Sequence, residues 1–321
     1  MNIFYLYSQP RSNWEKQVKA GRMPDHVLYG LNWLRQFGHN VGYSDAAFSQ
    51  FNLLKWLVSP LQRWFLHHHG VGFQLDQALL LLPQLRQADF IVTTNDSCGL
   101  PVAFLKWLGL LKTPQVYYHI GFNRSSKFLK KLIKQPKVLI DFKTTPPGVD
   151  IKFFHPKKVK FKYDIVSVGR DIGRDYMTLF QAIKDLPIKV KVICDPKNLI
   201  GLNIPANVSI DYSVSYLKVR QAYRGSKMVI IPTKKNTVSG QISLLEALAC
   251  GKPVIAAQTP ALNIAPVIFY QPQNAAQLKF KIQQLLKNPL RQFSSSMSHF
   301  SSKNFASQII SEIHPITNKL R

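Results

Sequence analysis

Residues 227–257 read KMVIIPTKKNTVSGQISLLEALACGKPVIAA, and this stretch decides the fold class. Short apolar runs at its two ends indicate buried strands, and the segment 241–250 between them indicates a helix. Gly251 suits the left-handed turn that ends a helix, and Pro253 prevents the helix from continuing. A strand, a helix and a second strand in succession predict a parallel sheet of the α/β class.

The same alternation continues on both sides of this stretch. Further strands are expected at 2–7, 89–93, 115–119, 163–168, 188–194 and 208–212, and helices at 26–38, 175–185, 215–225, 275–286 and 301–313. A proline-bearing segment, 146–156, separates the two series and indicates a linker. We therefore predict one Rossmann-like domain over 1–145 and another over 157–300. The helix within 301–321 is expected to pack back on the N-terminal domain.

The composition indicates a folded and strongly basic protein. The chain has 321 residues, 46% of them hydrophobic, which is enough for about two domains. Its three cysteines are scattered and show no disulfide or CxxC spacing. Lys and Arg number 42 against 16 Asp and Glu, a formal net charge of +26, and residues 124–162 alone hold twelve Lys or Arg. Such a field attracts polyanions, which include nucleic acid, an anionic membrane face and diphosphates.

We expect a cytoplasmic protein. The first seven residues run into polar Ser8, Gln9 and Pro10 without the cationic lead and long apolar centre of a secretion signal. The sequence also has no uninterrupted apolar run of about 18 residues, so a spanning helix is not expected.

The helix at 241–250 carries a narrow polar stripe. Its members recur at helical spacing: Ser239, Ser243, Glu246 and Cys250. Thr237 or Ser239 can cap the start of this helix. The small Ser239 and Gly240 would leave backbone N–H groups, and the positive end of the helix dipole, open to a phosphate. The alternative is a plain α/β helix whose Glu246 points to solvent.

A second polar cluster follows the strand at 163–168. It contains two glycines and two arginines: Gly169, Arg170, Gly173 and Arg174. Residues that follow a strand directly lie at the carboxyl edge of a parallel sheet, where ligands bind in open α/β folds. Guanidinium groups suit diphosphate oxygens. The alternative is two solvated turn arginines, one of them paired with Asp171 or Asp175.

In this order and at this separation, the two clusters resemble the C-terminal domain of the retaining GT-B glycosyltransferases of group 1, the family four type. The segments PPGVD (146–150) and FHP (154–156) are similar to that family's interdomain turn. MVIIPT (228–233) is similar to the strand ahead of its donor loop. The resemblance covers 146–257 and is weaker upstream.

The resemblance implies two Rossmann-like domains that face each other across a cleft. The N-terminal domain would lie on the acceptor side, and the C-terminal domain would bind a nucleotide sugar. The implied reaction moves a hexose-like group from a nucleoside diphosphate sugar to an acceptor, with retention at the anomeric carbon. It implies no metal and no cofactor, since the nucleotide sugar is the donor substrate.

The family's donor-binding residues carry over onto matching positions of this chain. Arg170 and Arg174 stand where an Arg and a Lys hold the donor diphosphate, although the spacing here is one residue shorter. Glu246 stands where a glutamate binds the nucleotide ribose. The loops that approach the phosphate and the sugar contain Gly169, Ser239, Gly240 and Gln241.

Three further positions concern the sugar and the acceptor. His119 matches the N-domain histidine that faces the transferred sugar, and the alternative is a capped core histidine. Val238 replaces the family's first glutamate, which affects recognition of the donor sugar. The glycine-rich acceptor loop usual after the first strand is missing from 8–24.

Two aromatic and basic segments lie in the first half of the chain. Residues 51–66 contain Trp56 and Trp64 between basic residues, and Pro60 is expected to split this segment into two short helices. Residues 125–135 form a basic amphipathic pattern. We hypothesise peripheral binding to an anionic membrane on its inner face, with access to a lipid-linked acceptor or a polysaccharide precursor. The alternative is core packing with a solvated lysine face.

Other chemistries find little support. Consecutive His67, His68 and His69 do not share a helix face and are expected on the surface. The chain has no Asp-x-Asp pair, no GxxxxGK[ST] loop and no GxGxxG. A nucleic-acid-binding protein remains a rival because of the charge, although nucleic acid is not the expected partner. A catalytically weak GT-B relative is the second rival, because of Val238.

Overall fold

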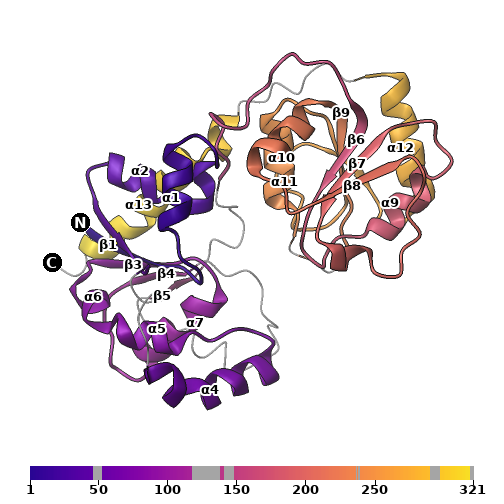
Figure 1. Cartoon of the computed structure of the whole chain (residues 1–321). Coiled ribbons are helices and arrows are strands. Elements are labelled where there is room, and N and C mark those ends of the chain that lie inside the picture. Colours follow the sequence, from indigo (N-terminus) through magenta and orange to yellow (C-terminus); the bar gives the residue numbers. More distant parts are fainter. Residues whose placement is uncertain are drawn as a thin grey trace. The chain divides into compact units, whose positions relative to one another are not determined.

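The computed structural model describes residues 1–45, 53–117, 138–140, 148–235, 237, 239–289 and 297–318. The chain divides into two compact units (Figure 1). The first unit comprises Met1–Lys19, Asp25–Pro147 and Ser302–Arg321, and the second comprises Ala20–Pro24 and Gly148–Ser301. No helix in the described part is both long enough and apolar enough to cross a membrane.

The first unit contains a parallel sheet in the order β2-β1-β3-β4-β5. Its strands are β1 (Asn2–Leu6), β2 (Asn40–Tyr43), β3 (Phe90–Thr93), β4 (Gln115–Tyr117) and β5 (Val138–Ile140). Strand β1 lies between β2 and β3, with Ile3 opposite Val41 on one side and Phe90 on the other. Apolar side chains of β1 and β3 are buried, which is why these strands read as continuous apolar runs.

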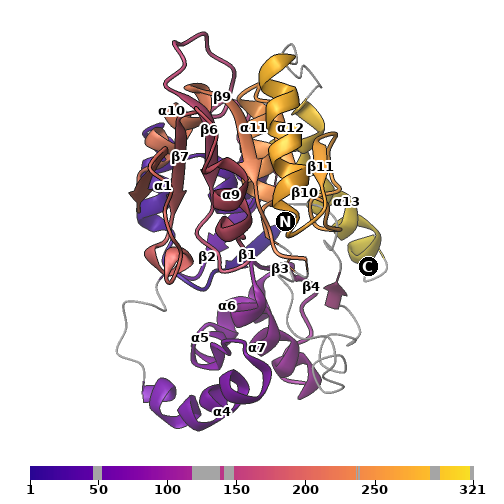
Figure 2. The same cartoon turned by 90° about the vertical axis from the view of Figure 1, so that its right-hand side faces the viewer.

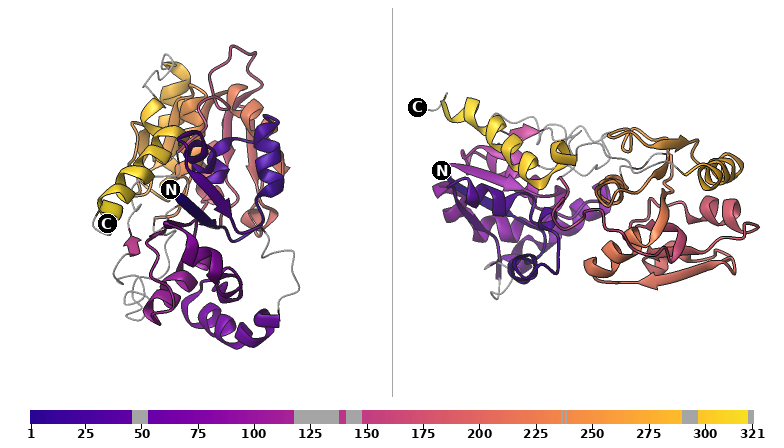
Figure 3. Two further views of the ribbon diagram at one scale, coloured as in Figure 1. Left: turned by 90° about the vertical axis from the view of Figure 1, so that its left-hand side faces the viewer. Right: turned by 90° about the horizontal axis from the view of Figure 1, so that it is seen from above.

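Helices surround this sheet. They are α1 (Ser12–Lys19), the 3₁₀ turn η1 (Asp25–Leu28), α2 (Leu31–Gln36), α4 (Leu53–His69), α5 (Leu75–Leu80), α6 (Leu82–Gln87), α7 (Asp96–Trp107) and α13 (Ser302–Asn318). The C-terminal helix α13 contacts α2 and runs beside the N-terminal strand (Figure 3). Gly30 allows this approach, since a Cβ there would lie 3.2 Å from the Cβ of Ala306.

Two predictions about helices in this unit are wrong. The helix expected over 26–38 is interrupted, because Tyr29 and Gly30 adopt left-handed backbone angles (φ 53° and 80°) between η1 and α2. Pro60 does not split α4, which is continuous. A proline cannot donate to the carbonyl four residues earlier, here that of Trp56. The Ser59 hydroxyl donates to the Trp56 carbonyl instead, at 3.0 Å, so this carbonyl still accepts a hydrogen bond.

The second unit contains a parallel sheet in the order β11-β10-β9-β6-β7-β8. The strands are β6 (Tyr163–Val168), β7 (Val190–Cys194), β8 (Val208–Tyr212), β9 (Ser226–Ile231), β10 (Val254–Ala257) and β11 (Ile268–Tyr270). From β6 the chain adds β7 and β8 on one side and then returns to place β9 on the other. The junction of β6 and β9 is therefore the topological switch point of this sheet.

Helices cover both faces of the second sheet. They are α9 (Tyr176–Ile183), α10 (Tyr216–Arg224), α11 (Gln241–Ala249) and α12 (Ala275–Lys287), with 3₁₀ turns η2 (Pro196–Leu199) and η3 (Met297–Phe300). Alternate strand residues divide between two cores: Val166 packs with α10 and α11, and Ile165 packs with α9 and α12. Figure 2 shows α9 and α12 on the near face of this sheet. This is a doubly wound α/β arrangement, as predicted.

Candidate functional site

Two loops meet at the switch point of the second sheet. One follows β6 and contains Gly169 to Asp175, and the other follows β9. Arg174 and Thr233 form an antiparallel bridge between them. The Lys234 N–H donates to the Gly173 carbonyl at 2.9 Å, and the Asp175 N–H donates to the Pro232 carbonyl at 3.0 Å. These backbone bonds hold both loops at the carboxyl edge, where ligands bind in such sheets.

Arg174 is the centre of this site. Its side chain is only 3% exposed. Nε donates to Oδ2 of Asp171 at 3.0 Å, and Nη2 donates to Oγ of Ser243 on α11, also at 3.0 Å. Its Nη1 is buried with no hydrogen-bond partner among the described residues. A buried cationic donor in this state favours an anionic ligand, because burial without a partner is costly.

Glycines let the backbone come close to this guanidinium. A Cβ on Gly169 would lie 1.9 Å from Nε of Arg174, so only glycine leaves room for the side chain. A Cβ on Gly173 would lie 2.3 Å from Oγ1 of Thr237. Gly240 has a φ of 100°, and a Cβ there would lie 3.3 Å from Nη1 of Arg174. These glycines therefore let the two loops pack closely around the guanidinium.

The start of α11 is open. Its N-cap is Gly240, and no side chain among the described residues caps the first turn. The predicted cap by Thr237 or Ser239 is wrong: Oγ1 of Thr237 accepts from the Ser239 N–H at 3.2 Å instead. The Ser239 hydroxyl is buried, and no described residue forms a hydrogen bond with it. The first-turn N–H groups, the helix dipole and Arg174 thus present positive potential at one point.

Glu246 lies further along α11 and is buried. It is 4% exposed, so it does not point to solvent. Its Oε2 accepts from the hydroxyl of Tyr223 on α10 at 3.1 Å. Burial, followed by the negative charge of Glu246, raises the pKa of the Tyr223 hydroxyl well above its usual range, so Tyr223 stays a neutral donor. The Tyr223 ring packs edge-on against Phe154 at 6.1 Å.

The two predicted arginines have different surroundings. Arg170 is exposed, as the solvated-turn alternative expects, whereas Arg174 is buried and pairs with Asp171. Gly169, Ser239, Gly240 and Gln241 lie in the two loops or at the start of α11. His119 and Val238 lie outside the described residues.

Sequence reasoning missed two contributors. Asp171 was expected only as one possible ion-pair partner, and it also accepts from the Gly173 N–H at 3.1 Å, which fixes the loop. Tyr223 had no local signal, because it reads as one more residue of an amphipathic helix. Only its contact with Glu246, 23 positions away, shows its place in the site.

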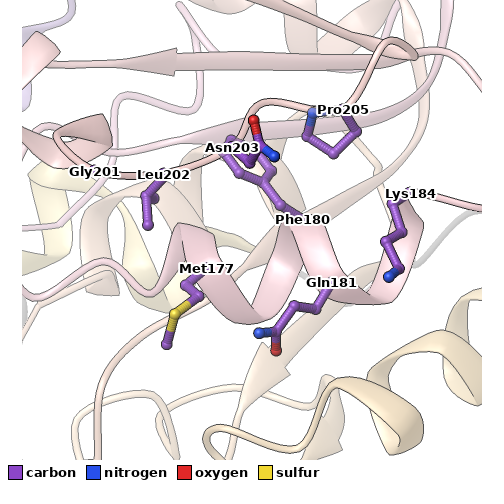
Figure 4. A pocket seen from close by; sticks show the side chains of 8 residues that line it. All are labelled: Met177, Phe180, Gln181, Lys184, Gly201, Leu202, Asn203 and Pro205. Carbon is purple, nitrogen blue, oxygen red and sulfur yellow. The ribbon is translucent and has the colours of Figure 1, made fainter.

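A hollow of about 300 Å³ lies elsewhere on the second unit (Figure 4). It lies between α9 and the segment 201–205, with Met177, Phe180 and Lys184 on the helix side. None of its lining residues is a predicted site residue. Across the described residues, no three His, Cys, Asp or Glu side chains gather in a way that could hold a metal ion.

Part of the second unit matches a known protein family. Residues 187–288 match the family described as "Glycosyl transferases group 1". This range contains α11 and Tyr223 and begins after Arg174. By fold, the chain is similar to GT-B glycosyltransferases. No curated protein matches the chain by sequence.

Solved structures of similar fold extend over nearly the whole chain. Sucrose-phosphate synthase from Thermosynechococcus elongatus has a TM-score of 0.62 at 14% identity, covering 100% of this chain and 98% of that one. Anabaena Alr3699/HepE in complex with UDP-glucose has a TM-score of 0.61 at 14% identity, covering 100% and 99%. AviGT4, a glycosyltransferase involved in avilamycin A biosynthesis, has a TM-score of 0.60 at 11% identity, covering 98% and 97%. The predicted α/β fold of GT-B type is confirmed.

Proposed function

We propose that the protein transfers a sugar from a nucleoside diphosphate sugar to an acceptor with retention of anomeric configuration. The observation that carries this proposal is the buried Arg174, whose Nη1 has no hydrogen-bond partner among the described residues. It lies beside the open start of α11, and the combination suits a diphosphate. Structures of the similar Anabaena protein with UDP-glucose and with UDP support this class of donor.

The leaving diphosphate gains negative charge as the bond to the anomeric carbon breaks. Arg174 would stabilise that charge together with the first-turn N–H groups of α11 and the Ser239 hydroxyl. Asp171 and Ser243 already orient the guanidinium, so little reorganisation is needed during the reaction. On this proposal, these groups neutralise the diphosphate and the transfer is independent of metal.

Glu246 would accept hydrogen bonds from the ribose hydroxyls, with its carboxylate oriented by Tyr223. Arg170 lies in the same loop with its side chain exposed, and we propose that it turns to the diphosphate when the donor binds. Gly169, Gly240 and Gln241 would line the path of the phosphate and the sugar. His119 would face the transferred sugar.

The acceptor is proposed to bind the first unit, residues 1–145. We propose a lipid-linked acceptor or a cell-surface polysaccharide precursor, reached from the cytoplasm at the membrane surface. The net charge of +26 supports an anionic acceptor or an anionic surface around it. A catalytically weak relative that binds nucleotide sugar without transfer is the second candidate, because Val238 replaces the family's first glutamate.

The test is release of nucleoside diphosphate from UDP-, GDP- and ADP-sugars. Wild type should turn over one of these donors, and Arg174→Ala and Glu246→Ala should each lower kcat/KM at least tenfold. The matched controls are the exposed Arg22→Ala and Glu312→Ala, which should leave turnover unchanged. Binding without turnover would favour the second candidate. Turnover that is indifferent to Arg174→Ala and Glu246→Ala would overturn the site, and a product of inverted configuration by NMR would overturn retention.

A further inference from the structure

Helix α4 has two apolar faces. On the inner face, Phe65 is buried, and Val58 and Leu61 pack against the core of the first unit. The outer face shows large apolar side chains to solvent, with Trp56 75%, Leu53 63% and Leu57 57% exposed. An amphipathic surface helix normally has one apolar stripe, so a second one indicates contact with something besides the core.

The outer residues form a continuous stripe. Leu53, Trp56, Leu57, Pro60 and Trp64 occupy positions i, i+3, i+4, i+7 and i+11, which lie on one side of a helix. Trp64 is 43% exposed, and its ring stacks on His68 at 4.9 Å. The continuity of α4 through Pro60 is essential, because two separate helices would not align these side chains.

The charge around the stripe has a single sign. Helix α4 contains no Asp or Glu, and its formal charges are Lys55 and Arg63, both exposed. Exposed His67 and His68 lie near its end. A second copy of this face would bring like charges together. A surface of anionic lipid headgroups complements them, and tryptophans favour the boundary between headgroups and acyl chains.

The stripe is presented on a fixed support. Phe65 stacks on Phe73 with centroids 3.7 Å apart and planes 4° from parallel. Gln62 donates to Oδ1 of Asp76 on α5 at 2.6 Å. Figure 1 shows α4 at the margin of the first unit, on the far side of α5 from the sheet. A helix fixed in this way can bind a planar surface without a further loss of conformational entropy.

We propose that α4 docks the first unit on an anionic lipid bilayer through Leu53, Trp56, Leu57, Pro60 and Trp64. The tryptophan and leucine side chains enter the interfacial region, and Arg63, which flanks the stripe on the helix, contacts lipid phosphates. This interaction surface goes beyond the transfer reaction and does not depend on the donor site. It would place the enzyme on the surface where a lipid-linked acceptor is found.

The test is flotation of the full chain with vesicles of phosphatidylcholine alone or mixed with phosphatidylglycerol. Wild type should float with the anionic vesicles and much less with the neutral ones. The double variant Trp56→Ala/Trp64→Ala should lower the partition coefficient at least tenfold, and Arg63→Gln should lower it about fivefold. The matched control is Ile200→Ala/Phe280→Ala, which removes apolar side chains that are 80% and 60% exposed on the second unit.

The control should float like wild type, and circular dichroism should show that all variants are folded. Absence of flotation with anionic vesicles would overturn the proposal. Flotation that the tryptophan double variant retains would overturn it too. A dimer in sedimentation that Trp56→Ala removes, without flotation of the wild type, would show a second copy as the occupant instead. Because flotation needs no donor, its failure leaves the proposed transfer reaction unaffected.

Discussion

Gly169→Ala tests the placement of Arg174 without altering any charged group. The added Cβ would lie 1.9 Å from Nε and 2.4 Å from Cζ of Arg174, so the guanidinium has to move. Gly169 does not have a left-handed φ, and alanine therefore adds no backbone strain there. Because the side chain is 3% exposed, it has no free space and must leave Asp171 and Ser243.

The expected loss follows from the bonds that Arg174 makes. Hydrogen bonds to a charged group contribute about 1.5–3 kcal/mol. If the displaced guanidinium no longer reaches the diphosphate, the dissociation constant for nucleoside diphosphate should rise roughly 10- to 150-fold. Overpacking should also lower the free energy of unfolding by about 1–3 kcal/mol, so binding is measured well below the melting temperature.

Calorimetric titration in a double-mutant cycle separates displacement of Arg174 from a general disturbance of the fold. In an Arg174→Ala background the alanine at position 169 has room, so Gly169→Ala should add less than about threefold to the loss. Two outcomes would refute the reasoning. One is wild-type affinity in a folded Gly169→Ala variant. The other is a Gly169→Ala/Arg174→Ala variant whose loss of affinity equals the product of the two single losses.

Three further predictions concern other contacts. Tyr223→Phe removes only the hydroxyl that donates to Glu246, so KM for the donor should rise about 3- to 10-fold with a smaller change in kcat. The control is Tyr212→Phe, which changes an exposed tyrosine. Unchanged kinetics in Tyr223→Phe would count against orientation of Glu246 by Tyr223. Gly30→Ala should destabilise the first unit by about 1–2 kcal/mol, because Gly30 has a left-handed φ of 80°. The loss should exceed that of Gly38→Ala, where φ is 85° but an added Cβ would meet nothing within 4 Å. Equal losses in thermal melts would show that the contact with Ala306 does not add to the destabilisation. Burial raises the pKa of the Cys250 thiol to about 12, so at pH 8 only about one part in ten thousand is thiolate. Reaction of the native protein with a thiol reagent should therefore be slow, and its rate should rise about tenfold per pH unit. Rapid labelling of Cys250 at pH 8 would contradict this prediction.

The sequence was informative wherever the evidence was local. Strands β6 and β8 were predicted to the residue. The last four residues of β6 are buried, as expected for an inner strand of a parallel sheet that is covered on both faces. Gly251 ends α11 in the left-handed conformation that its position indicated, with a φ of 73°. The Gly169–Arg174 and Ser239–Glu246 clusters were located because each follows a predicted strand.

Tertiary contacts limited the prediction of the site. Arg170 and Arg174 were equivalent in the sequence, and only the bridge to Thr233 and the contact with Ser243 make Arg174 the buried one. The role of Tyr223 depends on packing of α10 against α11, which no local pattern encodes. The continuity of α4 through Pro60 depended on one hydroxyl, that of Ser59, supplying the missing donor.

The central claim is that a nucleoside diphosphate binds at the junction of β6 and β9. Hydrogen exchange followed by mass spectrometry, with and without the nucleotide that titration selects, tests it directly. Bound nucleotide should slow amide exchange in peptides that cover 169–175 and 239–246, and should leave the segment 201–205 beside the α9 hollow unchanged. Slowed exchange only in the first unit or only around that hollow, with no effect in the two site peptides, would contradict the account.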